Sequence, residues 1–309
     1  MCSKLNYFDL HCDTLTELYD KGETLSDTTC MVTETSISSF GKYAQVFAVF
    51  SKHELDDKAC YQRFFDAVDS FEKNEGSFCK SKAELRHSID SSLPARILSV
   101  EDLRLSSCES EKLTSLFERG VRLVTPLWSG VTCIGGSFDT DEGLTEKGKN
   151  IIEQCLDSGI ICDVSHASSK STDEILTLAE KKGGGVIASH SNSFEVYAHP
   201  RNLTDREAVR IKQLGGIVGV SLVPYHLTDG EAKCEDVIRH ICHFLDIIGE
   251  DALALGCDFD GIEITPTDIR NQSEIYRLVN EMEQVGINRG LREKIFFDNA
   301  YNFFIKNMK

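Results

Sequence analysis

The chain has 309 residues, of which 33 are Lys or Arg and 50 are Asp or Glu, so its formal net charge is −17. This acidic balance argues against nucleic acid and against anionic membrane surfaces as partners, because both are bound by clustered basic side chains. Hydrophobic residues make up 41% of the chain and charged residues 27%, which is typical of a globular protein and argues against general disorder.

Short apolar runs rich in Val, Ile and Phe recur along the chain, and a longer segment with helical spacing follows each of them. The pattern predicts eight strands, near residues 7–10, 44–50, 96–100, 121–126, 160–164, 186–189, 216–222 and 252–257. It predicts helices between them, for example at residues 58–73, 145–158, 168–182, 231–248 and 273–285.

Eight strands alternating with helices over about 300 residues indicate an α/β protein with a (β/α)8 barrel, and a doubly wound parallel sheet is the competing architecture. No linker, low-complexity tract or charge block divides the chain, so we expect residues 1–309 to form one domain. A barrel carries its chemistry at the C-terminal ends of its strands. The unusual polar residues of this chain fall at such ends, which favours the barrel.

The first predicted strand runs into His11-Cys12-Asp13. In an extended segment, residues i and i+2 point to the same side, so His11 and Asp13 can share one binding site. Histidines and carboxylates also end four further predicted strands: Glu101, His166, His190 and Asp258. In a closed barrel these strand ends meet at one mouth, and we therefore expect the six groups to converge.

Each of these residues also has an ordinary interpretation. A single His at a strand end is often a core or capping residue, and Asp260, close to Asp258, suits a turn. The joint occurrence of imidazole nitrogens and carboxylate oxygens instead suits Zn²⁺ or a similar divalent ion. Six groups are too many for one tetrahedral ion, whereas a bridging Glu101 would let two ions use them.

The twelve cysteines do not suggest a second metal site. No Cys-x-x-Cys occurs, so a zinc ribbon or a thioredoxin-type motif is excluded, and we expect reduced thiols that act as small buried hydrophobes. The longest apolar runs fall far short of the roughly 20 residues that a membrane-spanning helix needs. No signal peptide is recognisable, and we expect a cytoplasmic protein.

Six motifs together resemble the signature of the membrane (renal) dipeptidase family. In chain order they are His11-Cys12-Asp13, Val100-Glu101, Asp163-Val164-Ser165-His166, Ser189-His190-Ser191, Arg201-Asn202 and Gly256-Cys257-Asp258-Phe259-Asp260-Gly261. The resemblance covers nearly the whole chain. It implies a distorted (β/α)8 TIM barrel of the metal-dependent hydrolase type, hydrolysis of dipeptides, two Zn²⁺ ions per chain and, commonly, a homodimer.

The resemblance also implies roles for individual residues. His11 and Asp13 would hold one zinc ion, His166 and His190 would hold the other, and Glu101 would bridge the two. A hydroxide held between the ions would then attack the peptide carbonyl.

Two further residues match the part of the family motif that handles the substrate. Arg201 would receive the free carboxylate of the dipeptide, a group that a guanidinium fork suits, although Arg201 could instead cap the helix that begins near Thr204. Asp258 would take the proton of the attacking hydroxide and pass it to the leaving amine.

The resemblance has a departure at Thr125-Pro126-Leu127-Trp128-Ser129. Vertebrate-type members carry a His in the place of Trp128, whereas microbial-type members resemble this chain. We therefore expect a microbial-type member in which Trp128 contacts the substrate and its indole N–H is a candidate donor to the oxygen of the tetrahedral intermediate. The Gly-Gly-His of vertebrate members is Asp102-Leu103-Arg104 here.

Other functions stay open. A related metal-dependent amidohydrolase could act on a cyclic amide, a lactone, a phosphotriester, or a D-amino-acid or N-acyl amino-acid substrate. Such enzymes usually carry His-x-His after the first strand and often a carboxylated Lys as bridge, which this chain replaces by Asp13 and Glu101. A non-catalytic barrel is less favoured because every expected ligand is present, and a serine hydrolase lacks its Gly-x-Ser-x-Gly motif.

Four of the remaining histidines can be interpreted from their positions. His240 and His243 lie within a predicted helix, so we expect a structural role for them, partly buried or at the surface. His199 and His226 fall in loops near the expected mouth of the barrel and are candidates for lining the substrate site.

Overall fold

The computed structural model describes residues 4–309. In chain order its strands are β1 (Tyr7–Cys12), β2 (Tyr43–Phe50), β3 (Ala95–Glu101), β4 (Val121–Thr125), β5 (Ile161–Asp163), β6 (Val186–Ile187), β7 (Val218–Val220) and β8 (Leu253–Leu255). All pairs are parallel, in the order β6-β5-β4-β3-β2-β1-β8-β7. A parallel bridge between Ala188 and Val218 joins the two edges, so the eight-stranded barrel predicted from the sequence is confirmed.

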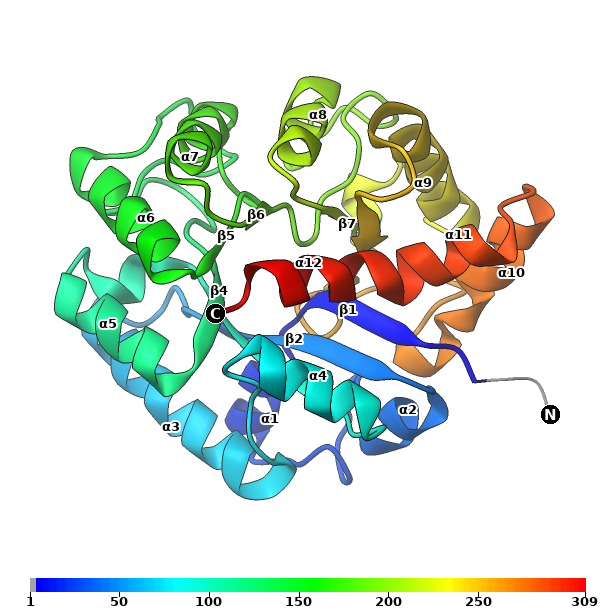
Figure 1. Cartoon of the computed structure of the whole chain (residues 1–309), viewed down its shortest axis with the longest axis horizontal. Helices are drawn as coiled ribbons and strands as arrows, with labels where there is room; N and C mark the ends of the chain where they lie inside the picture. The colour runs from blue at the N-terminus through cyan, green and yellow to red at the C-terminus, as the bar shows by residue number, and fades with distance from the viewer. Residues whose placement is uncertain (1–3) are drawn as a thin grey trace.

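Helices surround the barrel (Figure 1). They are α1 (Thr14–Lys21), α2 (Glu34–Ser39), α3 (Asp57–Glu75), α4 (Lys82–Asp90), α5 (Ser110–Arg119), α6 (Glu146–Ser158), α7 (Ser169–Lys182), α8 (Asp205–Gln213), α9 (Cys234–Ile248), α10 (Tyr276–Gln284), α11 (Arg289–Glu293) and α12 (Asn299–Asn307). Because helices cover its outer face and side chains fill its interior, β2 is buried along nearly its whole length and reads as an almost continuous apolar run.

Two predicted helices begin later than the periodicity indicates. The segment predicted at 231–248 becomes helical only at Cys234, whose N–H donates to Asp268 Oδ1 at 2.9 Å. The segment predicted at 273–285 opens with a 3-10 turn, Gln272–Glu274, and the α-helix α10 follows at Tyr276. In both cases polar residues at the N-terminal end serve turn and capping contacts, which periodicity alone does not reveal.

The C-terminal helix closes one end of the barrel. Figure 1 shows α12 lying across the sheet, where it contacts β1 and β8. Phe304 of α12 stacks on Phe8, near the start of β1, with ring centroids 5.2 Å apart. One interior apolar cluster joins this helix to the strands through Phe8, Leu10, Val46, Ile97, Leu123, Ile161, Ile187, Ala254, Phe303 and Phe304. The opposite end, where the strands terminate, is left for polar side chains.

Several strands end earlier than predicted because buried carboxylates take over their backbone donors. The strand expected at 186–189 ends at Ile187, and the N–H of Ser189 donates instead to Asp163 Oδ1 at 2.8 Å. The strand expected at 252–257 ends at Leu255, and the N–H of Cys257 donates to Asp9 Oδ1 at 3.0 Å. At these two strand ends, a carboxylate oxygen thus accepts a backbone N–H group in place of a neighbouring strand's carbonyl oxygen.

Two glycines make room for the backbone at Ser189, just after β6. A Cβ atom on Gly219 would lie 2.0 Å from the carbonyl oxygen of Ser189, and a Cβ atom on Gly256 would lie 1.7 Å from the same oxygen. The chain after β6 therefore runs against β7 and the end of β8 at a distance that only glycine permits. This close approach holds the segment that carries Ser189 and His190 against the seventh strand.

The cysteines of the described segment are free, and most of them are buried, as expected for thiols used in packing. Cys2 lies outside the described residues. Within residues 4–309, none of the helices combines the length and the hydropathy that crossing a bilayer requires.

We predict that Gly219→Ala lowers the free energy of unfolding by about 1–3 kcal/mol, because the added methyl group would overlap the Ser189 carbonyl. Chemical denaturation measures this change. Gly230→Ala is the matched control: nothing among the described residues lies within 4 Å of its added Cβ, so its effect should stay within about 0.5 kcal/mol. Equal stability of both variants would contradict the close approach.

Candidate metal centre

The six residues predicted to converge do so at the C-terminal end of the barrel. His11 lies in β1 with its Nε2 3.4 Å from Asp13 Oδ2, 3.4 Å from Glu101 Oε2 and 3.6 Å from Asp258 Oδ1. Asp13 follows β1 directly, and Glu101 is the last residue of β3. All four side chains are buried. Strand direction therefore places one imidazole among three carboxylates from three parts of the barrel.

Glu101 lies between two groups of ligands. Its Oε2 faces His11, whereas its Oε1 lies 3.0 Å from His166 Nε2 and 3.5 Å from His190 Nε2. The two Nε2 atoms lie 2.9 Å from each other. Sets of ligand atoms within 4.8 Å of one another are formed by His11 with Glu101 and His190, and by His11 with Asp13 and Asp258. The structure thus places His11 in both sets, a sharing that sequence reasoning did not predict.

The nitrogen and oxygen atoms of this site suit divalent cations, because several of them are buried and receive no hydrogen bond from the protein. Both ring nitrogens of His11 and Oδ1 of Asp13 have no hydrogen-bond partner within residues 4–309. His166 Nδ1 lies 3.1 Å from the carbonyl oxygen of Trp128, which can only accept, so its proton belongs on Nδ1 and its Nε2 lone pair faces Glu101. Imidazole nitrogens and carboxylate oxygens are ligands that Zn²⁺ prefers.

The pKa values of the protein groups reflect this crowding. Burial, followed by the charge of Glu101, raises the pKa of Asp13 to about 6. Burial also raises the pKa of Asp258, while burial lowers the pKa of His190. Burial opposes ionisation of Glu101, but the electrostatic interaction with His11 outweighs it and lowers the pKa of Glu101. Clustered buried carboxylates of this kind need positive charge nearby.

Two residues of the site have left-handed backbone conformations, which residues other than glycine rarely adopt. His166 has φ = 68° and Asp258 has φ = 64°. Each such residue costs about 1–3 kcal/mol and persists only where its surroundings hold it. The carbonyl oxygen of His166 accepts the N–H of Phe138 at 2.8 Å, and the N–H of Asp258 donates to the carbonyl of His11 at 3.2 Å. These contacts hold the two side chains toward the mouth.

A cleft of about 490 Å³ opens over the site. Arg201 lines one wall; its Nη2 lies 3.4 Å from the carbonyl oxygen of His190, and its Nε has no hydrogen-bond partner in the described part of the chain. Burial lowers the pKa of Arg201 to about 10, so the guanidinium remains charged near neutral pH. Trp128 is half-buried on another wall, with its ring centroid 4.2 Å from that of His53.

The cleft also contains residues that the sequence did not single out. Phe50, Lys52 and Glu54 follow or end β2, and Val223 and Tyr225 follow β7. Only their position after a predicted strand could have indicated them, because none of them belongs to a motif of metal-binding residues. His226 lines the cleft as expected, whereas His199 lies behind it and contacts the His226 ring with centroids 4.5 Å apart.

Two other polar residues have structural roles. Asp260 accepts hydrogen bonds from Thr14 Oγ1 and from the N–H of Met31, both at 2.6 Å, and so anchors the loop before α2, as its turn interpretation suggested. His240 lies in α9, where its Nδ1 accepts the N–H of Ser193 at 3.0 Å and its Nε2 donates to the carbonyl of Leu227 at 3.2 Å. The role of His240 is therefore structural, but its side chain is fully buried and not partly buried or at the surface as expected.

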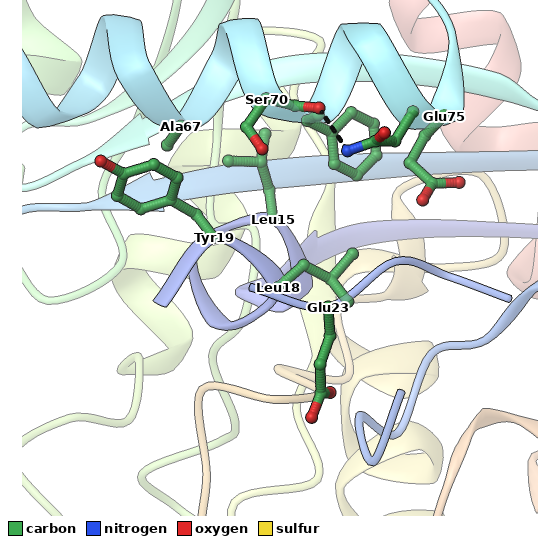
Figure 2. Close-up of a pocket in the computed structure, with 9 residues that line it drawn as sticks. Leu15, Leu18, Tyr19, Glu23, Ala67, Ser70 and Glu75 are labelled. Carbon is green, nitrogen blue, oxygen red and sulfur yellow. Dashed lines mark hydrogen bonds between the residues drawn. The ribbon is translucent and has the colours of Figure 1, made fainter. Parts of the chain in front are cut away.

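A second hollow lies away from these residues. Figure 2 shows it between α1 and α3, lined by Leu15, Leu18, Tyr19, Glu23, Ala67, Ser70 and Glu75. Its volume is about 10 Å³, which is room for no more than a water molecule. The cleft above Glu101 is therefore the better candidate for binding a substrate.

We predict that the protein carries divalent metal at this centre and that chelation lowers its melting temperature by roughly 5 °C, since the buried carboxylates then lose their counter-charge. Metal analysis and thermal melting, with and without added Zn²⁺, measure the effect. Glu101→Gln should remove most of the recovery on adding Zn²⁺. Glu195→Gln, in an exposed cluster with Asp205 and His243, should keep it. Recovery in Glu101→Gln equal to wild type would contradict the assignment.

The amino-acid sequence of this chain is similar to those of known proteins along most of its length. Residues 1–306 match the profile of the membrane dipeptidase family, peptidase family M19. A protein of unassigned function from the pqqA 5′ region of Klebsiella pneumoniae is 30% identical over 234 residues, which cover 72% of this chain and 85% of that protein. The dipeptidase tcpJ of Claviceps purpurea is 30% identical over 213 residues, or 67% of this chain; this chain spans about half of that relative, 49%.

Solved structures agree on the fold. A metallopeptidase from Rhodobacter sphaeroides, crystallised with a phosphinate mimic of the dipeptide L-Ala-D-Ala, superposes with a TM-score of 0.90 over 99% of this chain and 100% of that chain, at 23% identity. A dipeptidase of family M19 superposes with a TM-score of 0.91 over 99% of both chains, at 24% identity. The match along residues 1–306 confirms the resemblance and the enzyme class predicted from the sequence: the chain belongs to the membrane dipeptidase family, a family of metallopeptidases.

Proposed function

We propose that this protein is a dipeptidase that uses two divalent ions, with Zn²⁺ as the expected metal. The observation that carries the proposal is Glu101, whose Oε2 faces His11 at 3.4 Å while its Oε1 faces His166 at 3.0 Å. A carboxylate with its two oxygens directed at different ligand groups suits a bridge between two ions. His11 and Asp13 would hold one ion, and His166 and His190 the other.

Two such ions would lower the pKa of a shared water toward about 7 and polarise the peptide carbonyl. The chain's own residues then have separate tasks. Asp258 lines the cleft beside His11, and burial raises the pKa of its carboxyl group, which suits a group that accepts a proton from the attacking water and returns it to the leaving amine.

Arg201 would bind the C-terminal carboxylate of the dipeptide. Its guanidinium is buried in the wall of the cleft, and the unpaired Nε among the described residues leaves a donor for a ligand. A planar carboxylate is the group that accepts two parallel N–H bonds from such a fork. The dipeptide mimic bound to the Rhodobacter sphaeroides metallopeptidase, a structure of the same fold, supports a dipeptide as the substrate class.

An aromatic wall of the cleft would face the rest of the dipeptide. Trp128 and Phe50 line the cleft there, and His53 packs on Trp128; the ring centroids of Phe50 and His53 lie 4.9 and 4.2 Å from that of Trp128. We propose that this aromatic wall contacts the substrate and that the indole N–H of Trp128 serves the oxygen of the tetrahedral intermediate. One domain over residues 1–309, a homodimer and a cytoplasmic location stay predictions from the sequence and the resemblance.

We predict that Asp258→Asn lowers kcat by at least about 10²-fold, because an amide cannot accept the proton of the attacking water. Steady-state hydrolysis of a dipeptide panel measures the loss, and metal analysis of the same preparation should give the wild-type content. Full activity in this variant would show that another group transfers the proton. Loss of metal together with activity would make Asp258 a ligand rather than a base.

We predict that the wild-type protein hydrolyses a dipeptide about 10²-fold more efficiently, by kcat/KM, than the same dipeptide with an amidated C-terminus, because the amide cannot pair with Arg201. Arg201→Ala should abolish this preference. Arg201→Lys should keep part of it, since the charge remains but the fork is lost. An N-acylated dipeptide tests the amino end independently. A preference that is unchanged in Arg201→Ala would contradict the assignment.

A further inference from the structure

A network of hydrogen bonds lies beneath His190, outside the cleft. Its centre is Asp163, the last residue of β5, which is fully buried. Asp163 Oδ1 accepts two backbone N–H groups, from Ser165 at 2.9 Å and Ser189 at 2.8 Å. Asp163 Oδ2 accepts two hydroxyl groups, from Thr125 at 2.7 Å and from Ser189. Every contact of this carboxylate therefore uses it as an acceptor, and the two kinds of donor are sorted onto different oxygens.

The network has a direction that reaches His190. Because the Ser189 hydroxyl donates its only proton to Asp163, its lone pairs remain for His190 Nδ1, which lies 2.6 Å away. Nδ1 must then carry the proton, and Nε2 presents a free lone pair. That lone pair faces Glu101 Oε1 at 3.5 Å. The form of the imidazole that can bind a cation is thus selected by two side chains that do not line the cleft.

The other two histidines of the centre are controlled differently. His166 donates from Nδ1 to the carbonyl oxygen of Trp128, a backbone group that no substitution removes. His11 has no hydrogen-bond partner on either nitrogen in the segment that the structure describes. Among the three, His190 alone has a tautomer set by side-chain groups, and those groups can be changed one at a time.

We infer that Asp163 and Ser189 are positioning residues that hold His190 in its Nδ1-protonated tautomer and thereby set the affinity of the centre for divalent cations. The inference rests on the proposed function in one respect, that His190 is a metal ligand. A partner of this kind fixes ring orientation as well as tautomer, and its loss typically costs 10–100-fold in metal affinity. Neither residue would touch the substrate.

Asp163 also ties together the ends of three strands, so a purely structural role must be separated from this one. Ser189→Ala removes the hydroxyl that links Asp163 to His190 and leaves the Ser189 N–H bond in place. Thr125→Val, nearly the same shape, removes the other hydroxyl from the same carboxylate oxygen but does not touch His190. Both positions are fully buried, so the two variants are matched for burial.

The first measurement is the affinity of the metal-free full chain for Zn²⁺, by competition with a chromophoric chelator. We expect Ser189→Ala to bind about 10–100-fold more weakly than wild type and Thr125→Val to stay within about 3-fold. Thermal melting of the metal-free proteins checks that both variants fold. Equal weakening in both variants would overturn the inference in favour of a structural role, and so would wild-type affinity in Ser189→Ala.

Asp163→Asn gives a sharper test because it should reverse the network. The two backbone N–H groups at Oδ1 still require an oxygen there, so the amide nitrogen would replace Oδ2 and donate to Ser189 Oγ. The Ser189 proton would then turn toward His190 Nδ1, and the imidazole proton would move to Nε2, where it blocks a cation. The wrong tautomer imposed by a comparable Asp-to-Asn change is known to cost catalysis heavily in serine proteases.

Long-range ¹H–¹⁵N correlation spectra of the histidine rings report the tautomer directly in the metal-free protein. We expect one ring, identified by its absence in His190→Gln, to change from Nδ1–H in wild type to Nε2–H in Asp163→Asn. The double variant Asp163→Asn/Ser189→Ala should bind Zn²⁺ more tightly than Asp163→Asn alone, because the reversed donor is gone. An Nδ1–H ring in Asp163→Asn, or additive losses in the double variant, would overturn the inference.

These results are distinguishable from a failure of the proposed function. If the wild-type protein hydrolyses no dipeptide, the proposed substrate is wrong, while the Zn²⁺ affinities and the ring spectra still decide the roles of Asp163 and Ser189. If the wild-type protein binds no Zn²⁺, the inferred control of affinity falls with the metal centre, whatever the spectra report.

Discussion

The burial of three carboxylates around one imidazole is the constraint on which the C-terminal end of this barrel depends. Asp13, Glu101 and Asp258 approach His11 from three directions, and all are withdrawn from water. Buried like charges are costly without a partner, and Arg201, a positive group of the chain, lies in the wall of the cleft. The chain carries a net charge of −17, yet its centre demands positive charge.

The backbone around the centre departs from regular barrel geometry for the same reason. At two strand ends, buried carboxylates accept backbone N–H groups in place of a neighbouring strand: Asp9 after β8 and Asp163 after β6. Gly219 and Gly256 allow this because they lack a Cβ where the Ser189 carbonyl passes. Strained conformations at His166 and Asp258 belong to the same arrangement. The regular part of the barrel, closed at its other end by α12, is stabilised by apolar packing. That packing offsets the free-energy cost of the strained backbone at the site.

The sequence predicted which candidate metal-binding residues would lie together better than it predicted their surroundings. Alternation of strands and helices, with His and carboxylate residues at strand ends, was enough to place six residues at one mouth. It was not enough to find Phe50 and Lys52, whose only signal is that they follow a strand. Nor did it predict that the backbone carbonyl of Trp128 would orient His166, because backbone groups carry no sequence signature. The helices at 231–248 and 273–285 were predicted too long, since capping contacts such as that of Cys234 with Asp268 are tertiary.

The sequence by itself determined the order of the elements, the barrel, the residue types of the candidate metal centre and the family. Each of these follows from local periodicity or from residue identity at fixed positions. Only the tertiary structure decided which oxygen of Glu101 faces which histidine, that His11 belongs to both ligand groups, and that Asp163 reaches His190 through Ser189. These facts depend on differences of a few tenths of an ångström in the distances between residues far apart in the chain. Hydrogen-bond direction and metal affinity are sensitive to such distances, whereas hydrophobic patterning is not.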